Sequence, residues 1–374
     1  MRHDLEFRSI PAMVRASASR FADGEALADL DDGRRWSFRE VADEMVRAAR
    51  AVRALGVKPG DRVAVWGPNC PEWIFAALGV QAAGGVLVPL NTRFKAAEAE
   101  YILRKSGAGT VFTVTGFLGA DYLGMLPEGV RAVVMRGGKA TGGALGWEEF
   151  LALGERVDER AVLGVIEGLG PDDVSDIMFT PGTTGRPKGV VLGHGQSLRA
   201  YGWLSDVFTF RPGDRFLIIP PFFHTFGYKA GWLACLMQGV TTLPQPVFDA
   251  GQVLERIERE RVSILLGPPT LFEDLMRHPR RAARLLGAHP SVAEVAVIGV
   301  PDERLGEVGA AFVVRGDASL TEEELVAWVR EHMANYKAPR RIAFVDTLPR
   351  NASMKLEKGR LRALLVERPA DSLE

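Results

Sequence analysis

Short apolar runs alternate with helix-length amphipathic segments along most of the chain, and this alternation limits the possible folds more than any other feature. Residues 63–66 and 86–89 are two such runs, each too short for a helix and bounded by turn residues. The segment between them, residues 72–83, has the length of a helix. Buried strands separated by helices predict an α/β protein with a largely parallel sheet. Further short runs occupy residues 109–114, 131–135, 216–219 and 263–266.

One helix can be delimited from its ends. Ser37 and Glu40 have the spacing of a capping box, in which each side chain satisfies a backbone N–H of the first turn. Apolar residues then recur at helical spacing from Val41 to Leu55, and Gly56 stands where a glycine often ends a helix. These signals predict a helix between Ser37 and Gly56.

Composition excludes several classes of function. The 374 residues include 46 Lys and Arg and 47 Asp and Glu, a formal charge of −1 that favours neither nucleic acid nor an anionic membrane as partner. The two cysteines, Cys70 and Cys235, form no C-x-x-C pair and suit a reducing compartment. The sequence has no apolar stretch of membrane-spanning length, and residues 1–7 do not resemble a signal peptide. We therefore expect a cytoplasmic protein without an integral membrane segment.

The rhythm of the sequence changes near residues 277–284, an Arg-rich stretch. Beyond it come two strand-like runs, a second capping box at Thr321 and Glu324, a third run at 341–345 and a basic tail helix after Lys355. We expect residues 1–280 to form a large N-terminal α/β domain and residues 285–374 to form a small α+β C-terminal domain.

The stretch Asp176-Ile-Met-Phe-Thr-Pro-Gly-Thr-Thr-Gly-Arg-Pro-Lys-Gly-Val-Val191 carries the strongest chemical signal. A strand enters a loop that is rich in glycine and threonine, and Lys188 closes the loop before a second strand. Glycines allow the backbone N–H groups to turn inward, the threonines add hydroxyl donors, and the lysine adds a positive charge. This combination predicts a polyphosphate site. The residues that would bind the phosphates are Thr180, Gly182, Thr183, Thr184, Gly185 and Lys188.

The loop differs from the G-x-x-x-x-G-K-[ST] phosphate loop, because Gly185 precedes Lys188 by three positions instead of one, and Gly189 stands where Ser or Thr is required. An ordinary Gly/Thr hairpin with an exposed lysine is the alternative interpretation.

Four stretches together resemble the adenylate-forming acyl-CoA synthetases, the AMP-dependent synthetase/ligase family. The segment Phe179–Val190 resembles the family's signature loop, and Pro220-Pro-Phe-Phe-His-Thr-Phe-Gly-Tyr228 resembles the following block. Gly299–Val308 resembles the opening of the mobile C-terminal domain. Leu348-Pro-Arg-Asn-Ala-Ser-Met-Lys355 resembles the terminal block.

The resemblance implies a two-step reaction. A carboxylic acid attacks the α-phosphate of ATP to give an acyl-adenylate and pyrophosphate, and the thiol of coenzyme A then displaces AMP. ATP, Mg²⁺ and coenzyme A are the implied cofactors, with Mg²⁺ held mainly by the nucleotide. Lys188 and Lys355 are the implied catalytic residues, because each would place a cation at the reacting phosphates. The sequence contains no metal-binding motif of its own.

The resemblance also places an acyl pocket at the second block. His224 would stand at its gate, with Phe223, Phe226, Gly227 and Tyr228 around it. Packing of these aromatics at a strand–helix junction is the alternative. The block and Phe117–Asp121 are similar to ligases for propanoate side chains on steroid rings, and a fatty acid remains an alternative substrate.

Two blocks of the family are missing. The sequence has neither the Tyr-Gly-x-Thr-Glu block for adenine nor the Thr-Gly-Asp block for ribose, so roughly a hundred residues are absent near residues 277–286. Pro181 and Met354 also depart from the family's Ser and Gly. We expect an incomplete N-terminal domain and impaired ligase activity. The alternatives are a non-catalytic remnant that binds polyphosphate or acyl groups, and a gene shortened by an assembly error or an engineered deletion.

Overall fold

The computed structural model describes residues 7–180, 186–302, 306–332, 339, 341–350 and 356–367. By its internal contacts the chain divides into two compact units. The first contains residues 1–248 and 259–266, and the second contains residues 249–258 and 267–374.

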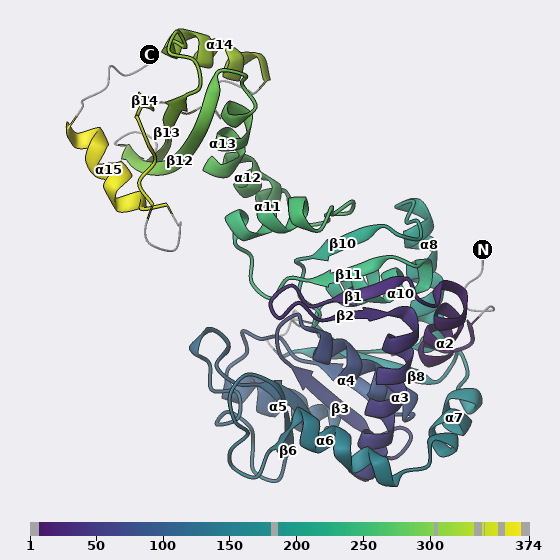
Figure 1. Cartoon of the computed structure of the whole chain (residues 1–374). Coiled ribbons are helices and arrows are strands. Elements are labelled where there is room, and N and C mark those ends of the chain that lie inside the picture. Colours follow the sequence, from purple (N-terminus) through teal and green to yellow (C-terminus); the bar gives the residue numbers. More distant parts are fainter. Residues whose placement is uncertain are drawn as a thin grey trace. The chain divides into compact units, whose positions relative to one another are not determined.

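The first unit is built on a seven-stranded sheet (Figure 1) with the strand order β7-β6-β5-β3-β4-β8-β9. All neighbouring strands run parallel except β8 and β9, which form an antiparallel hairpin at one edge. The parallel sheet confirms the α/β prediction. The strands are β3 (Arg62–Trp66), β4 (Val86–Pro89), β5 (Thr110–Val114), β6 (Arg131–Arg136), β7 (Leu145–Gly146), β8 (Val174–Thr180) and β9 (Lys188–Gly193).

Helix α4 (Pro71–Ala82) has every residue buried. A helix that is apolar on all sides must be covered on all sides, and α4 contacts β3 and β4 below it and α3 (Phe38–Ala54) beside it. Helix α3 in turn contacts the strands of a second sheet. The two helices thus join the two sheets of the unit around one core. The other helices of this part are α2 (Ile10–Phe21), α5 (Ala96–Ser106), α6 (Trp147–Leu153), α7 (Glu159–Gly168) and the short η1 (Phe117–Gly119) and η2 (Gly154–Arg156).

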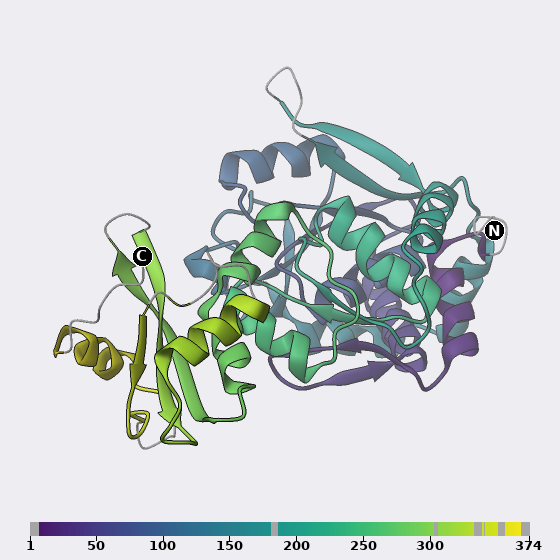
Figure 2. The ribbon, with the colours of Figure 1, turned by 90° about the horizontal axis from the view of Figure 1, so that it is seen from above.

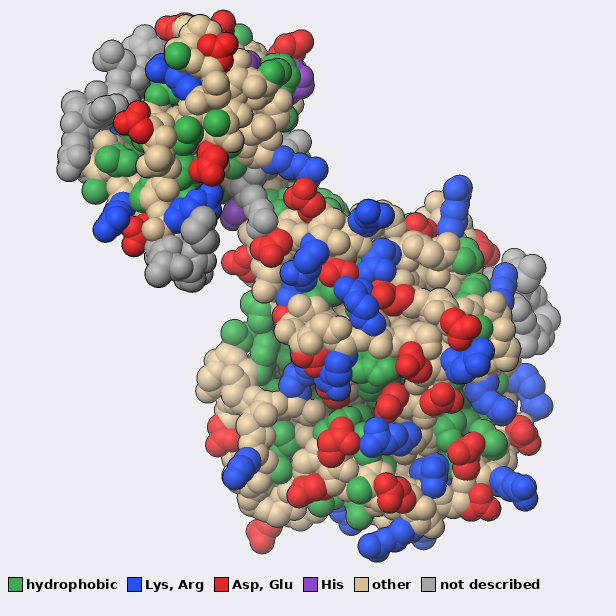
Figure 3. Space-filling view, in the orientation of Figure 1, with side chains coloured by type: hydrophobic (Ala, Val, Ile, Leu, Met, Phe, Trp, Pro, Cys, Tyr) green, Lys and Arg blue, Asp and Glu red, His purple; other side chains and the backbone are tan. Residues whose placement is uncertain are grey.

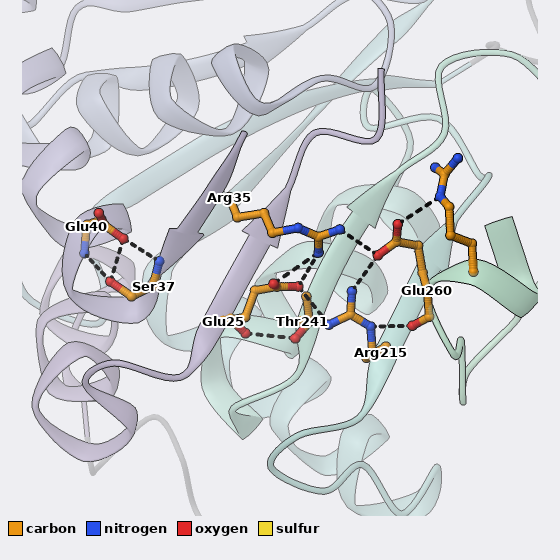
Figure 4. A network of polar contacts seen from close by, with 8 residues as sticks. Glu25, Arg35, Ser37, Glu40, Arg215, Thr241 and Glu260 are labelled. Carbon is orange, nitrogen blue, oxygen red and sulfur yellow. Dashed lines mark hydrogen bonds and ion pairs between the residues drawn. The ribbon is translucent and has the colours of Figure 1, made fainter. Parts of the chain in front are cut away.

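The second sheet has the order β10-β11-β1-β2. An ion-pair network ties its strands together (Figure 4): Arg35 and Arg215 both bind the carboxylates of Glu25 and Glu260. The elements are β1 (Glu25–Ala28), β2 (Arg35–Ser37), β10 (Arg215–Ile218) and β11 (Thr241–Pro244), with α8 (His194–Val207), α9 (Thr225–Gly227), the π-helix η3 (Tyr228–Leu233) and α10 (Ala234–Gln238) between β9 and β11.

The second unit contains a three-stranded sheet with the order β12-β13-β14. Alternate residues of β13 pack into two small hydrophobic cores on opposite faces of the sheet. Ala310 and Phe312 pack in one core with residues of α15, and Ala311 and Val313 pack in the other with residues of α13 and α14. This period of two is the signature of a strand with both faces covered. The elements are α11 (Ala250–Arg259), α12 (Pro269–Arg277), α13 (Pro279–Gly287), β12 (Val292–Asp302), β13 (Gly306–Arg315), α14 (Glu322–His332), β14 (Arg341–Phe344) and α15 (Lys358–Glu367).

Both capping boxes are confirmed. Ser37 and Glu40 cap α3 reciprocally, and Thr321 and Glu324 do the same at α14. The strand predicted at 263–266 is wrong, because only Ile264 forms a bridge, to Phe216. A single bridge does not make a ladder, and an edge segment becomes a strand only when a partner pairs with it continuously.

Three further observations concern the surface and the thiols. Acidic and basic side chains are interspersed over the face of the larger unit in Figure 3. Cys70 and Cys235 are both buried and unbonded. In the described part of the chain, no helix combines the length and apolar character needed to cross a bilayer.

Candidate nucleotide and acyl site

The predicted phosphate loop connects β8 to β9, which form an antiparallel hairpin (Figure 2). Thr180 and Lys188 face each other as the last and first residues of the two strands. Both are exposed, so the hydroxyl and the ammonium are available to a ligand. The other four predicted phosphate-binding residues lie outside the described residues; they are Gly182, Thr183, Thr184 and Gly185.

The base of this hairpin is firmly held. Strand β8 pairs with β4 in parallel, through Asp176 opposite Leu87, so Thr180 stands at the carboxyl end of a strand inside an open sheet. That end is where α/β sheets bind their ligands. Tyr101 of α5 supports the far arm of the loop, because its hydroxyl donates to Pro187 O at 3.3 Å and its ring lies under the Arg186 guanidinium. Tyr101 is not among the site residues predicted from the sequence.

The second predicted catalytic lysine, Lys355, lies outside the described residues. Its flanks belong to the second unit, where Arg350 and Leu356 form a bridge. The role of Lys355 stays a prediction.

The segment Pro220–Tyr228, called the acyl block below, follows β10 and is held by a buried asparagine. Asn69 donates its amide to Ile218 O, Pro220 O and Gln245 O at 3.0–3.2 Å. Its Oδ1 accepts from Phe222 N at 2.7 Å. Asn69 lies between β3 and α4 in the turn Gly67-Pro-Asn-Cys70. Its amide group is therefore the link between the large sheet and the acyl block.

His224 is exposed and caps α9, where its Nδ1 accepts from Phe226 N at 3.4 Å. Phe223 and Phe226 are half-buried, so both retain surface that a ligand can contact. By contrast Phe222 is fully buried, and its ring packs edge-on against Trp73. The exposed histidine and the two half-buried rings are the members of the block that remain open to a ligand.

Gly227 and Tyr228 are placed by packing. A Cβ on Gly227 would clash with the backbone oxygens of Pro220 and Pro221, so only glycine fits this turn. Tyr228 is fully buried, stacks on Trp232 at 4.7 Å, and its hydroxyl accepts from Gln81 Nε2 at 2.8 Å. Burial raises the pKa of Tyr228 well above its ordinary value. In the structure its ring belongs to the core beneath the block.

Two of the predicted phosphate-binding residues can be compared with the chemistry that a polyphosphate requires. Thr180 and Lys188 offer a hydroxyl and a cation at the carboxyl end of β8, which suits terminal phosphates. Among the described residues no group of three or more His, Cys, Asp or Glu could hold a metal ion. A divalent cation would therefore depend on the phosphates for most of its ligands.

Comparisons with known proteins decide the family. The model of the AMP-binding enzyme family matches residues 14–341. The chain belongs to this family. A relative from Mycobacterium tuberculosis, 3-[(3aS,4S,7aS)-7a-methyl-1,5-dioxo-octahydro-1H-inden-4-yl]propanoyl:CoA ligase, is 32% identical over 96% of this chain and 99% of its own length. The ligase of the same name from Rhodococcus jostii is 31% identical over 94% of this chain and 98% of its own length. Human medium-chain acyl-CoA ligase ACSF2 is 30% identical over 74% of this chain and 49% of its own length.

Solved structures agree on the fold. A Mycobacterium tuberculosis fatty acyl CoA synthetase superposes with a TM-score of 0.59 at 22% identity, covering 97% of this chain and 99% of its own. The N-terminal domain of FACL13 from the same organism gives a TM-score of 0.59 at 29% identity, and the superposition covers 74% of this chain and 66% of that domain's chain. The chain is thus an acyl-CoA synthetase by family, and such ligases use ATP and coenzyme A.

The internal gap is also visible in these comparisons. The alignment with the Mycobacterium tuberculosis ligase spans 508 residues, whereas this chain has 374, so at least 134 of the aligned positions have no residue of this chain. Nearly the whole relative is covered, so most of this difference lies inside the chain. A missing internal segment is what the absent adenine and ribose blocks indicated.

Proposed function

We propose that this chain is an acid–CoA ligase for a propanoate side chain on a fused, steroid-derived ring system. The observation that carries the proposal is the alignment with the Mycobacterium tuberculosis ligase, which extends over 96% of this chain and 99% of that protein. The reaction would join the carboxylate to coenzyme A at the expense of ATP, which becomes AMP and pyrophosphate. A fatty acid is the second candidate substrate, because ACSF2 relatives also match.

The acyl block supports an apolar acid. Phe223 and Phe226 present half-buried rings, which a fused carbocycle could cover without losing hydrogen bonds. His224, exposed at the start of α9, would stand at the entrance. Gly227 and the buried Tyr228 would shape the floor behind these rings.

The hairpin would act on the phosphates. Lys188 would stabilise the negative charge that grows on the departing pyrophosphate, and Thr180 would orient a phosphate oxygen through its hydroxyl. Gly182, Thr183, Thr184 and Gly185 would add donors from the loop, and Lys355 would bring a second cation to the attacked phosphorus. Mg²⁺ would be held mainly by the nucleotide and would neutralise part of the phosphate charge.

The missing segment favours reduced turnover. Adenine and ribose recognition depends on buried polar contacts that are difficult to replace, and the blocks that supply them in the family are absent from the sequence. The specific alternative is a protein that binds polyphosphate or acyl groups without joining them to coenzyme A.

ATP–pyrophosphate exchange tests the proposal. We expect exchange above background with ring-bearing propanoates, weaker exchange with straight-chain acids of equal carbon number, and loss of exchange in Lys188→Ala and Lys355→Ala. Lys139→Ala, which removes an exposed lysine from the loop after β6, is the matched control and should retain full exchange. No exchange with any acid, together with calorimetric binding of tripolyphosphate that depends on Lys188, would establish the binding protein instead.

A further inference from the structure

Two buried charged side chains link strand β8 to the π-helix η3. Lys229 Nζ lies 2.9 Å from Asp176 Oδ2, and the side chains are only 1% and 0% exposed. Asp176 precedes Thr180 by four positions on β8, and Lys229 is the first residue after the acyl block. The ion pair therefore joins the strand that leads into the phosphate loop to the helix that continues the acyl block.

Hydrogen bonds fix the direction of both charges. Ser175 Oγ lies 2.7 Å from Asp176 Oδ2 and 3.0 Å from Leu192 O of β9. On the other side, Lys229 Nζ donates to Ser197 Oγ of α8 at 2.6 Å. The pair is thus anchored to both strands of the hairpin and to the helix that follows it.

A second, neutral bridge connects the same two elements. Gln81 of α4, fully buried, donates its amide to Ser175 O at 3.2 Å and to the Tyr228 hydroxyl at 2.8 Å. Strand β8 and η3 are therefore held together twice, once through charge and once through an amide. Both bridges lie in the buried layer beneath the hairpin.

Stability alone explains this arrangement poorly. A buried ion pair contributes little more than a well-packed apolar pair of the same volume, because both charges lose their hydration. What the ion pair adds is a fixed alignment of β8 with η3. A shift of β8 by one residue would turn Asp176 to the opposite face of the sheet, and Asp176 is the position at which β8 meets both β4 and β9.

The partner helix is unusual as well. Lys229 lies in a π-helical segment in which Gly231 has φ −92° and ψ −111°, outside helical geometry. π-Helical turns are rare and occur frequently at functional sites. In the described structure, this turn places the Lys229 ammonium over the carboxylate of β8.

We propose that Lys229 and Asp176 are positioning residues that hold the phosphate-loop strand and the acyl block in the alignment required for the acid to reach the α-phosphate. The proposal rests on the ligase function proposed above. Neither residue contacts a substrate; they act through β8 and η3. Reacting groups must approach to about 3–3.5 Å, and a misplacement of about 1 Å costs on the order of 100-fold in rate.

Neutral substitutions separate positioning from stability. Lys229→Met and Asp176→Asn each leave one unpaired buried charge, so both single variants should melt at lower temperature. The double variant has no such charge and should recover most of the loss. If the pair aligns the two elements, kcat for ATP–pyrophosphate exchange in the double variant still falls about 10- to 100-fold, while KM for ATP changes little. A double variant with wild-type kcat overturns the proposal.

A measurement that does not need activity distinguishes this proposal from failure of the ligase function. Hydrogen exchange of the amides of residues 174–180 and 188–193 should be faster in the double variant, with exchange in α3 unchanged. If the wild-type protein supports no ATP–pyrophosphate exchange with any acid, the proposed function fails. The hydrogen exchange of the hairpin amides then decides the positioning role by itself. Equal protection of the hairpin in both proteins overturns it.

Two controls complete the experiment. Arg47→Met combined with Glu148→Gln removes an exposed ion pair in which Arg47 Nη2 lies 3.1 Å from Glu148 Oε2. This double variant should change neither kcat nor the hydrogen-exchange protection of the hairpin. If the double variant fails to fold, Lys229→Arg is compared with Lys229→Met, because arginine keeps the charge. More retained activity and hairpin protection in Lys229→Arg supports the positioning role, whereas equal losses contradict it.

Discussion

Asn69 is separated by 149 to 176 positions from the residues whose backbone oxygens its amide contacts. Nothing in its sequence context distinguishes it from an ordinary turn residue. In the structure it is 4% exposed and satisfies the backbone on both sides of the acyl block. At the scale of single residues, the block is therefore shaped by a side chain outside it.

Removing the Asn69 side chain should loosen the acyl block. Asn69→Ala removes the hydrogen bonds that its amide makes to Pro220 O and Phe222 N, and we expect it to lower the free energy of unfolding by about 1–3 kcal/mol. Urea unfolding measures the loss. Asn91→Ala is the control, because the Asn91 side chain accepts only one exposed turn hydrogen bond, from Arg93 N. Equal stability of the two variants would contradict this assignment.

His194 provides a pH-dependent test. It is 1% exposed and its Nδ1 accepts from Ile10 N at 3.2 Å. Burial lowers the pKa of His194 to about 4; the nearby Asp173 carboxylate opposes this shift, and the Lys229 charge adds to it. Between about pH 6.5 and 4 the unfolded chain therefore binds this proton and the folded chain does not.

Stability should consequently fall as the pH drops below about 6.5, by up to about 3 kcal/mol at pH 4 from this group. His194→Gln keeps an acceptor for Ile10 N and cannot titrate, so its stability should depend less on pH over this range. Denaturant unfolding at pH 7, 6 and 5 compares the two proteins. Parallel pH profiles would show that His194 is not buried in its neutral form.

At the scale of elements, local signals placed most of the strands but fewer than half of the helices, with α2, α5 and α7 among those that were not predicted. The capping box of α3 appears as predicted, with Glu40 N donating to Ser37 Oγ at 3.2 Å and Ser37 N donating to Glu40 Oε2 at 2.7 Å. These contacts span three residues, which is why the sequence reveals them. The segment 263–266 was apolar enough for a strand but has a single bridge, because strand formation depends on a partner elsewhere in the chain.

The α3 box should contribute measurably to stability. Ser37→Ala removes the acceptor for Glu40 N, and we expect a loss of about 1 kcal/mol in the free energy of unfolding. Ser19→Ala is the matched control. The Ser19 hydroxyl donates a hydrogen bond to Arg15 O within its own helix, and alanine is favoured inside a helix. Thermal unfolding followed by circular dichroism distinguishes the two. A neutral Ser37→Ala would mean that water replaces the cap without cost.

At the scale of the whole chain, one edge of the seven-stranded sheet exposes apolar side chains. Strand β9 ends the seven-stranded sheet, and its Val190 and Val191 are 43% and 57% exposed. Val191 also lines a surface pocket of about 610 Å³ with Val174 and Ile177 of β8. Exposed apolar edge strands are prone to pair with other chains. We therefore expect the purified protein to be poorly soluble or to bind hydrophobic dyes strongly.

A charge on this edge should reduce both effects. Val191→Lys places an ammonium where another strand would pair, so dye fluorescence and aggregation measured by light scattering should fall. Leu118→Lys adds the same charge at a more exposed position away from this edge and should have little effect. A wild-type protein that is monomeric, binds no dye and melts in one sharp transition would contradict the prediction.

The sequence alone determined the α/β class, the capping boxes, the family and the gap, because each is recorded in contiguous residues or in their absence. Only the tertiary structure decided which residues support the site. Asn69, Tyr101 and the Lys229–Asp176 pair act across 53 or more positions of sequence, as in the 2.9 Å contact between β8 and η3. Such contacts form when packing brings distant segments together and excludes water, and neither event leaves a periodic or local pattern in the chain.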